Sequence, residues 1–178
     1  IAAIPLVLVL PGDSDSSLSK TLKRELQKSQ GVATLPKAAK LGDAEIQGAV
    51  LIHCSAKAEA GPTQKLAARC LSLKAPLDQL GNSKLPIWIV FSGALESKSG
   101  DVDPCEAGAW AFARVAANEY AALDIRRIDI AQGISPQEAA SRLSALVASK
   151  TDETEIQIDL NCTRAVRVEY ASLVQTGG

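Results

Sequence analysis

The chain has 178 residues, 47% of them hydrophobic and 3% aromatic, and its 19 basic residues nearly balance 20 acidic ones, for a formal net charge of -1. This is enough apolar material for the core of one globular domain. The near-neutral charge, with no block of Lys or Arg, argues against nucleic acid and anionic membranes as partners, and the few aromatic residues argue against base stacking. No apolar run reaches the roughly 20 residues of a membrane span.

The beginning of the chain predicts a strand, a turn and a helix. Residues 6–10, LVLVL, form a short apolar run that is typical of a buried strand. Residues 11–16 begin with Pro and Gly and indicate a turn, and the helix after it carries Leu18, Leu22 and Leu26 on one face. A dinucleotide-binding fold carries its GxGxxG loop at such a turn.

The turn at residues 11–16 lacks the residues that hold a dinucleotide. Gly12 is its only glycine, and Asp13 and Asp15 would place negative charge where a pyrophosphate must approach backbone N–H groups. Because the mechanism of the motif depends on the missing glycines, we interpret this turn as structural.

Strand and helix signals continue along the chain. Residues 31–35 and 48–54 predict two more strands, and residues 36–47 join them as a connection or short helix. Pro62 then opens a helix with leucines at helical spacing. Pro76 lies inside that pattern, so we expect it to kink the helix or to end its regular segment a turn early.

The clearest pattern begins at residues 87–91, an apolar run with β-branched and aromatic residues that predicts a strand covered on both faces. Three start signals agree for the next helix, because Asp103 suits the N-cap, Pro104 suits the first helical position and Glu106 completes a capping box. We expect Arg114, on this helix, to reach a carboxylate or chain carbonyls at the helix edge.

A further strand and helix follow. Residues 125–130 predict the strand. Ser135, Pro136 and Glu138 repeat the capping signature. They precede a helix whose inner side carries four apolar residues: Ala139, Leu143, Leu146 and Val147.

Two alternating segments come next. Residues 155–160 and 164–170 alternate apolar with polar positions, which favours an antiparallel hairpin with one solvated face. Residues 171–178 are typical of a linker or the beginning of another strand. The order of strands and helices therefore predicts an α/β fold with a mostly parallel sheet, helices on both faces and a C-terminal β-hairpin.

Two stretches carry a resemblance to a known family: WIVFSGA at residues 88–94 and DPCEAGAWAFARVAANE at residues 103–119. They resemble the ketoreductase region of modular type I polyketide synthases and, more narrowly, its structural, non-catalytic subdomain. In that family a strand ending in Gly-Ala precedes Asp-Pro and a helix with Trp, a small residue, Arg and Glu at this spacing. Further matches at residues 70–73 and 128–130 extend the resemblance over most of the chain.

The resemblance implies a truncated Rossmann-like structural subdomain at residues 1–170, with residues 171–178 as a linker or the start of the next subdomain. It also implies a cytoplasmic scaffold that packs against a catalytic ketoreductase subdomain and neighbouring synthase domains, while NADPH belongs to that partner. We then expect no catalytic, cofactor-binding or metal-binding residue in this chain, which alone would not be an enzyme. Since it begins at Ile1 without an initiator Met, we also expect a piece of a longer protein.

The tyrosines give an independent test of reductase chemistry. A nicotinamide reductase of the short-chain type needs a Tyr acid with a Lys four residues on, which lowers the tyrosine pKa and holds the ribose. At that offset Tyr120 is followed by Asp124, and Tyr170 by Val174. The sequence thus lacks both the phosphate loop and the proton donor, and two independent absences argue against catalysis.

Histidine and cysteine offer little catalytic chemistry. A dyad of His53 and Cys105 is an alternative to a His53 that bonds to the backbone, whereas Cys54 is excluded because adjacent strand residues point to opposite faces. No CxxC spacing occurs, so we predict no zinc site and expect the four cysteines to be reduced: Cys54, Cys70, Cys105 and Cys162.

The loop that begins at Ser92 and ends at Asp103 defines the main alternative. Glu96, Asp101 and Asp103 lie at the carboxyl end of a strand, the usual place for ligand sites in such sheets, but no base or basic partner accompanies them. A self-contained small-molecule-binding or reductase domain with an unrecognised site here is one alternative. Another is a protein-docking pseudo-ketoreductase, for which an exposed apolar patch on the Trp110 helix would be the sign.

Overall fold

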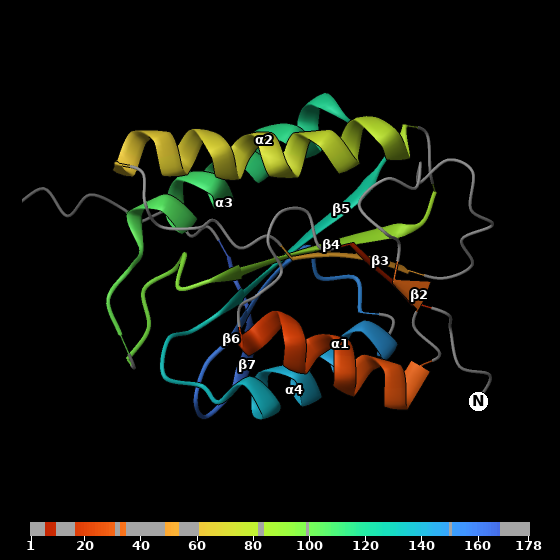
Figure 1. Ribbon diagram of the computed structural model, residues 1–178, viewed down its shortest axis with the longest axis vertical. Helices are drawn as coiled ribbons and strands as arrows, with labels where there is room; N and C mark the ends of the chain where they lie inside the picture. The colour runs from red at the N-terminus through yellow and green to blue at the C-terminus, as the bar shows by residue number, and fades with distance from the viewer. Residues whose placement is uncertain are drawn as a thin grey trace, which may run out of the picture.

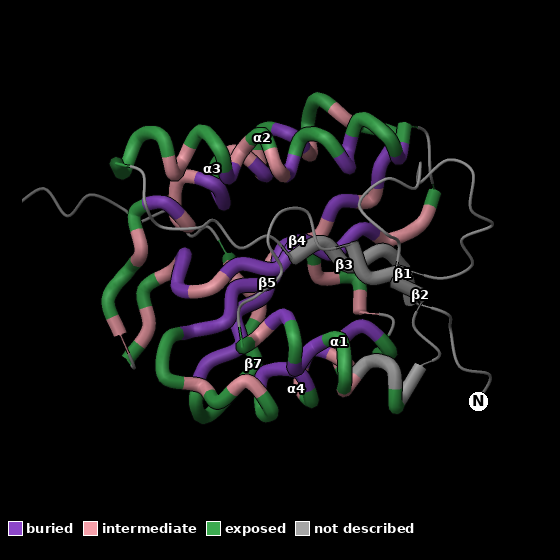
Figure 2. The backbone as a smooth tube through the Cα atoms, viewed as in Figure 1, coloured by how far each residue is buried: buried purple, intermediate pink, exposed green. Residues whose placement is uncertain are grey.

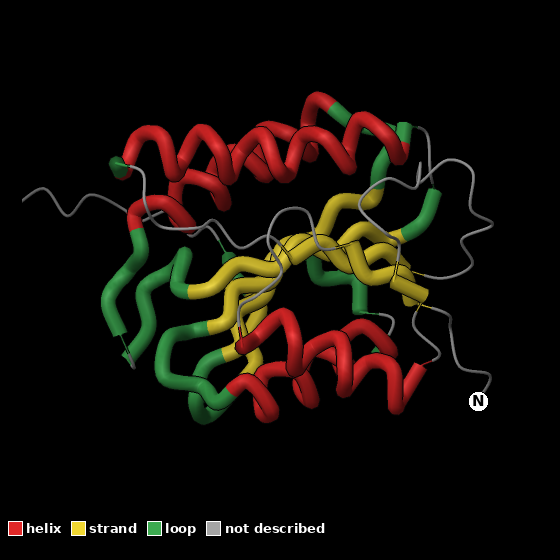
Figure 3. The backbone as a smooth tube through the Cα atoms, in the orientation of Figure 1, coloured by secondary structure: helices red, strands yellow, loops and turns green. Residues whose placement is uncertain are grey.

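The protein has three layers, with a sheet between two pairs of helices. Helices α2 (Pro62–Leu80) and α3 (Pro104–Glu119) cover one face of the sheet, and α1 (Ser17–Gln30) and α4 (Pro136–Ala148) cover the other (Figures 1 and 3). This arrangement comes from a computed structural model that describes residues 6–9, 17–30, 33–34, 49–53, 61–81, 84–98, 100–149 and 151–167.

The sheet confirms the predicted α/β fold. Its strands are β1 (Leu6–Val9), β2 (Ala33–Thr34), β3 (Ala49–His53), β4 (Pro86–Ser92), β5 (Asp124–Ile130), β6 (Glu155–Ile158) and β7 (Thr163–Ala165). Their order in the sheet is β2-β1-β3-β4-β5-β6-β7. Neighbouring strands are parallel except β7, which is antiparallel to β6. The fold is therefore a truncated, Rossmann-like one with helices on both faces.

The strand order reverses at β1, which lies between β2 and β3. In open α/β sheets ligands bind outside the carboxyl ends of the strands, at such a reversal. The segments that follow β1 and β3 there, residues 10–16 and 54–60, lie outside the described residues, and so does the predicted turn with Gly12. The predicted connection at residues 36–47 also lies outside them.

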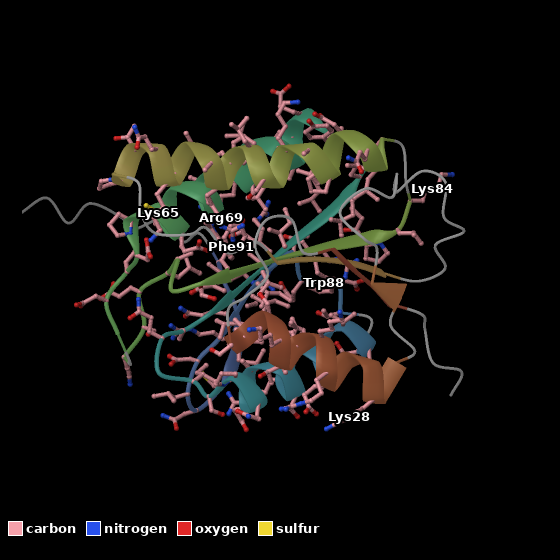
Figure 4. All side chains as sticks on the ribbon, in the orientation of Figure 1. Lys28, Lys65, Arg69, Lys84, Trp88 and Phe91 are labelled. Atoms are coloured by element: carbon pink, nitrogen blue, oxygen red, sulfur yellow. The ribbon has the colours of Figure 1, made fainter. Side chains whose placement is uncertain are left out.

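Strand β4 divides the core between the two helical layers. Ile87, Ile89 and Phe91 join the cluster under α2 and α3, and Trp88 and Val90 join the cluster over α1 and α4. Figure 4 shows Phe91 and Trp88 on opposite sides of the strand, and Figure 2 shows burial concentrated along the central strands. This alternation explains the nearly continuous apolar run, because both faces of a central parallel strand are covered.

Of the two outcomes predicted for Pro76, a kink or an early end of the regular helix, the early end is wrong. Helix α2 continues through Pro76 to Leu80 and does not end a turn early. Pro76 faces inward and is buried beside Leu77 in the helix, so packing of its ring against the core compensates for the backbone hydrogen bond that a proline cannot donate. Gly81 follows with a positive φ of 53° and ends the helix.

The predicted hairpin is confirmed, but its solvated face is not. Strands β6 and β7 pair antiparallel, with Ile156 opposite Ala165 and Ile158 opposite Thr163. Gln157, expected to face solvent, is buried at 1% exposure because it belongs to a polar network inside the molecule. The expected strand positions 168–170 and the predicted linker at 171–178 lie outside the described residues.

Candidate functional site at the carboxyl end of the sheet

The start of α3 is fixed by Asp103, as predicted for its N-cap. The Asp103 carboxylate accepts hydrogen bonds from the backbone N–H of Cys105 (2.8 Å) and Glu106 (3.3 Å). The second half of the predicted capping box is wrong, because the Asp103 N–H donates to the Gly93 carbonyl (2.8 Å). The Glu106 side chain turns instead to a buried arginine, Arg69.

Arg69 and Glu106 form an ion pair between α2 and α3. Arg69 is 1% exposed, and its Nε and Nη2 donate to the two Glu106 carboxylate oxygens at 2.9 and 3.1 Å. The same Nη2 donates to the Val90 carbonyl (3.2 Å), while Glu106 accepts from the Ser92 N–H (3.3 Å). The guanidinium also lies 5.2 Å from the centre of the Phe91 ring, which Figure 4 shows beneath it.

This ion pair takes the place of a neighbouring strand. In a parallel ladder, the C=O of one residue and the N–H of the residue two positions later face the same adjacent strand. The β3–β4 register ends at the pair His53 and Val90. Beyond it, the Val90 C=O and the Ser92 N–H are bonded to Arg69 and Glu106. The end of β4 thus has its backbone groups satisfied by side chains of the helical layer.

Asp129, on β5, holds the loop that follows β4. Its carboxylate is fully buried and accepts hydrogen bonds from the N–H of Ala94 (2.8 Å) and Leu95 (3.1 Å) and from Gln157 Nε2 (3.2 Å). Burial raises the pKa of Asp129, assisted by the charge of Glu106 and opposed by these three hydrogen bonds. An acid that bonds consecutive backbone donors at a strand end fixes the loop in one conformation.

Gln157 extends this network to the hairpin. Its Nε2 also donates to the Glu96 carbonyl (3.2 Å), and its Oε1 accepts from Arg164 Nε (3.0 Å) on β7. The sequence pattern does not indicate Gln157 and Arg164 as members of a network, and Asp129 stands out only as part of the family match at residues 128–130. A signal was present, since Asp129 is a charged residue between Ile128 and Ile130 in a strand that is otherwise apolar at this end.

Four consecutive N–H groups at the end of β4, from Ser92 to Leu95, are bonded within the protein. Ser92 donates to Glu106, and Ala94 and Leu95 donate to Asp129. The N–H of Gly93 donates to the Ile130 carbonyl (2.9 Å). Consecutive free N–H groups at a strand end can bind a phosphate, but here they are engaged and two carboxylates add negative charge.

The loop is also packed closely against Gln132, the second residue after β5. Gly93 has a φ of +76°, and a Cβ there would lie 2.9 Å from the Gln132 side-chain amide. A Cβ on Gly100 would lie 2.8 Å from Gln132 Cβ. Both glycines therefore allow the loop to contact Gln132, and the positive φ makes any other residue at position 93 strained.

The three acidic residues predicted as site candidates in this loop do not form one cluster. Glu96 and Asp101 are exposed, and Asp103 is the helix cap, with Lys65 Nζ at 3.8 Å from its carboxylate. Within the described part of the chain, no group of three or more His, Cys, Asp or Glu side chains could hold a metal ion. Asp103 therefore fixes the backbone at the start of α3, and Lys65 gives it the basic partner that the sequence did not indicate.

Two of the remaining catalytic candidates, Tyr120 and Cys105, lie within the described residues. Tyr120 ends α3, and its hydroxyl hydrogen bonds to Asp78, which raises the pKa of Tyr120, the direction opposite to that of an activated tyrosine acid. It lies four residues before the first residue of β5, at the amino end of that strand. Cys105 Sγ lies 3.5 Å from the Pro62 carbonyl, and the side chains of His53 and Tyr170 lie outside what the structure describes.

The expectation for Arg114 is confirmed. Its Nε donates to Glu155 Oε1 at 2.8 Å, and Arg127 Nη2 lies 2.8 Å from the same oxygen. Burial would raise the pKa of Glu155, but the two guanidinium groups outweigh it and lower that pKa. This second ion cluster ties α3 to the first residue of β6.

Proteins of known structure share this fold. No protein-family model matches the sequence, and a search among curated proteins finds no match. A C2-type ketoreductase from a modular polyketide synthase is similar in structure, with a TM-score of 0.68 and 19% identity over 93% of this chain and 40% of that one. A-type ketoreductases from a modular polyketide synthase give 0.66 and 22% over 92% and 38%.

A short-chain dehydrogenase shares the fold less closely. It comes from Rhodopseudomonas palustris and gives a TM-score of 0.54 and 12% identity over 86% of this chain and 97% of that one. The protein therefore has a ketoreductase-like, Rossmann-type α/β fold and spans about two fifths of the length of each polyketide synthase ketoreductase it resembles. Among the described helices, none is both long and apolar enough to cross a membrane.

Proposed function

We propose that this chain is the structural, non-catalytic subdomain of a polyketide synthase ketoreductase. It acts as a cytoplasmic scaffold that packs against the catalytic subdomain, which binds NADPH and reduces the β-ketoacyl intermediate. The observation that carries the proposal is the engagement of the N–H groups from Ser92 to Leu95 by internal acceptors, two of them carboxylates. These four N–H groups are therefore not available to a phosphate or a reacting carbonyl.

The outer surface of the α2–α3 layer is the face we assign to the catalytic subdomain. Leu71 on α2 is 66% exposed and Val115 on α3 is 57% exposed. Around them the two helices expose small residues, including Ala67, Ala75 and Ala111, together with the charged Lys74 and Glu119. Large exposed apolar side chains favour protein contact. The similar ketoreductases contain more than half a chain beyond the matched region, which is the occupant we propose.

A fluorescence titration with NADPH tests the absence of a cofactor site. The scaffold proposal predicts no saturable binding to this chain up to about 1 mM NADPH, equivalent to a site weaker than about 4 kcal/mol. Micromolar binding would refute it. That result would favour the alternative of a self-contained reductase with a site in the loop between Ser92 and Asp103.

Co-purification with the catalytic ketoreductase subdomain of the same synthase tests the packing face. We expect the double variant Leu71→Arg, Val115→Arg to lose the complex, because it introduces two charges into the apolar contact. Leu160→Arg is the matched control, since Leu160 is also a large exposed apolar residue (45%) but lies after β6, away from α2 and α3 in the chain. Retention of the complex by the double variant would contradict the assignment.

A protein-docking pseudo-ketoreductase is the second candidate function, favoured by the same exposed Val115 on the Trp110 helix. It shares the docking face but has no active partner. Reduction of a β-ketoacyl thioester with NADPH by the purified complex separates the two candidates. Turnover supports the scaffold of an active ketoreductase, and its absence in a complex that still forms supports the pseudo-ketoreductase.

A further inference from the structure

Asp129 has an ionisable side chain at a fully buried position of β5, which is unusual. Its carboxylate is fully buried, and its partners in the described network are two backbone N–H groups and one side-chain amide, none of them charged. A buried carboxylate needs strong donors at fixed positions, because desolvation of the ionised group is costly. The position of the Gln157 amide therefore matters more than that of an ordinary buried glutamine.

Arg164 fixes one end of that amide, and the Glu96 carbonyl, which accepts from Gln157 Nε2, fixes the other. A glutamine amide has a donor end and an acceptor end of nearly the same shape. Arg164 has donors only, and its Nε and Nη2 both contact Gln157 Oε1, at 3.0 and 2.5 Å. With the oxygen held there, the Gln157 nitrogen must face Asp129. A reversed amide would place its oxygen against the carboxylate and repel it.

The three residues link two regions of the chain that are distant in sequence. Arg164 lies on β7 and is exposed, Gln157 lies on β6, and Asp129 lies on β5 and bonds to the loop after β4. Each step along this line is a hydrogen bond between neighbouring strands. We propose that Arg164, Gln157 and Asp129 form a relay through which the β6–β7 hairpin locks the loop that follows β4.

The relay gives that loop two states. While Arg164 contacts Gln157, the N–H groups of Ala94 and Leu95 remain bonded to Asp129. When Arg164 is drawn away from the exposed end, Gln157 Oε1 loses both guanidinium contacts and the amide is held only through Nε2, by Asp129 and the Glu96 carbonyl, so the N–H groups of Ala94 and Leu95 open to solvent more often. Arg164 is thus a positioning residue, and its exposed guanidinium is the group whose contact with Gln157 locks or releases the loop.

Hydrogen exchange of single amides, measured by NMR on Arg164→Ala, tests the relay. We expect exchange of the Ala94 and Leu95 amides to become about tenfold faster. The Gly93 amide, bonded to the Ile130 carbonyl, should not change. Arg167→Ala is the matched control, because Arg167 lies just after the same hairpin, is exposed and pairs only with Glu153 among its described contacts. Unchanged exchange at Ala94 and Leu95 would overturn the relay.

General destabilisation has a different signature, because it would accelerate the amides of Gly93, Ala94 and Leu95 together. That result also overturns the relay. Arg164→Lys keeps a cationic donor and should restore slow exchange. Gln157→Met should accelerate the same two amides, and combining it with Arg164→Ala should add nothing further. Effects of the two substitutions that simply add would mean independent contacts and would contradict the proposal.

Discussion

The two faces of the sheet are built differently over the same strands. Toward α1 and α4 the central positions of β4, β5 and β6 are apolar: Trp88, Val90, Ile128, Ile130, Ile156 and Ile158. Toward α2 and α3 the sheet is apolar along β4, but β5 and β6 present buried or half-buried polar residues there: Arg127, Asp129, Glu155 and Gln157. The same covering of helices therefore rests on an apolar layer on one side and on a polar network on the other.

This difference shows which contacts require precise atomic positions. Apolar contacts are non-directional, so α1 and α4 can adjust on their layer with small loss. Each buried polar group under α3 needs a partner at a fixed distance and angle. The polar half thereby sets one arrangement of α3, of the loop after β4 and of the hairpin.

Arg69→Met tests the polar side most strongly. It leaves the Glu106 carboxylate without its cation, and we expect a loss of about 3–5 kcal/mol in the free energy of unfolding, measured by urea denaturation. Arg69→Met combined with Glu106→Gln removes the unpaired charge while an amide oxygen still accepts from Ser92, so some of the loss should return. A loss below about 1 kcal/mol in the single variant would mean that the ion pair does not hold the end of β4.

Leu143→Ala is the corresponding test on the apolar side. Leu143 is fully buried on α4, and its truncation should cost about 3 kcal/mol through lost burial and a residual cavity. The loss should be the same at every pH at which the protein is folded, since no charged group is removed. A loss that varies with pH would break the distinction between the two faces.

The pH dependence of stability separates two carboxylates within the polar face. Burial raises the pKa of Asp129 above 3.8, so its contribution to stability is full below that pH and is lost as pH rises through the folded pKa. Arg114 and Arg127 lower the pKa of Glu155 below 4.5 against the effect of burial, so its contribution is present above that pH and is lost as pH falls.

Urea denaturation of Asp129→Asn and Glu155→Gln between about pH 3 and pH 7 should therefore give opposite trends. The loss caused by Asp129→Asn should grow as pH falls, and the loss caused by Glu155→Gln should shrink. Each trend is limited to about 1.4 kcal/mol per pH unit, the value for one proton. Parallel trends would contradict the assignment of opposite pKa directions to these two groups.

The sequence predicted the apolar face well and the polar face poorly. Periodic leucines and the run at residues 87–91 determined strands and helices, because burial of one face follows directly from spacing. Glu106 was assigned to the helix cap, and Gln157 to a solvated strand face. Their partners, Arg69 and Asp129, are distant in sequence, and a local pattern carries no information about a contact across 37 or 28 positions.

The contact between α2 and α3 gives the smallest effect. A Cβ on Gly108 would lie 2.8 Å from Leu66 Cδ1, the end of a flexible and half-buried side chain. Gly108→Ala gains about 1 kcal/mol of helix propensity and must shift Leu66, so we expect a net change within about 0.5 kcal/mol in urea denaturation. Ala111→Gly, at an exposed position of the same helix, measures the propensity alone and should cost about 1 kcal/mol.

The two values together measure how tightly the helices meet. If Gly108→Ala stabilises the protein by the full amount that Ala111→Gly costs, Leu66 moves freely and the glycine is not needed for the contact. A loss greater than about 1 kcal/mol would mean that Leu66 is held in place and that α2 and α3 form one rigid layer. The expected intermediate result places the rigidity of this layer in the Arg69–Glu106 ion pair, with Gly108 allowing the close approach that brings the pair together.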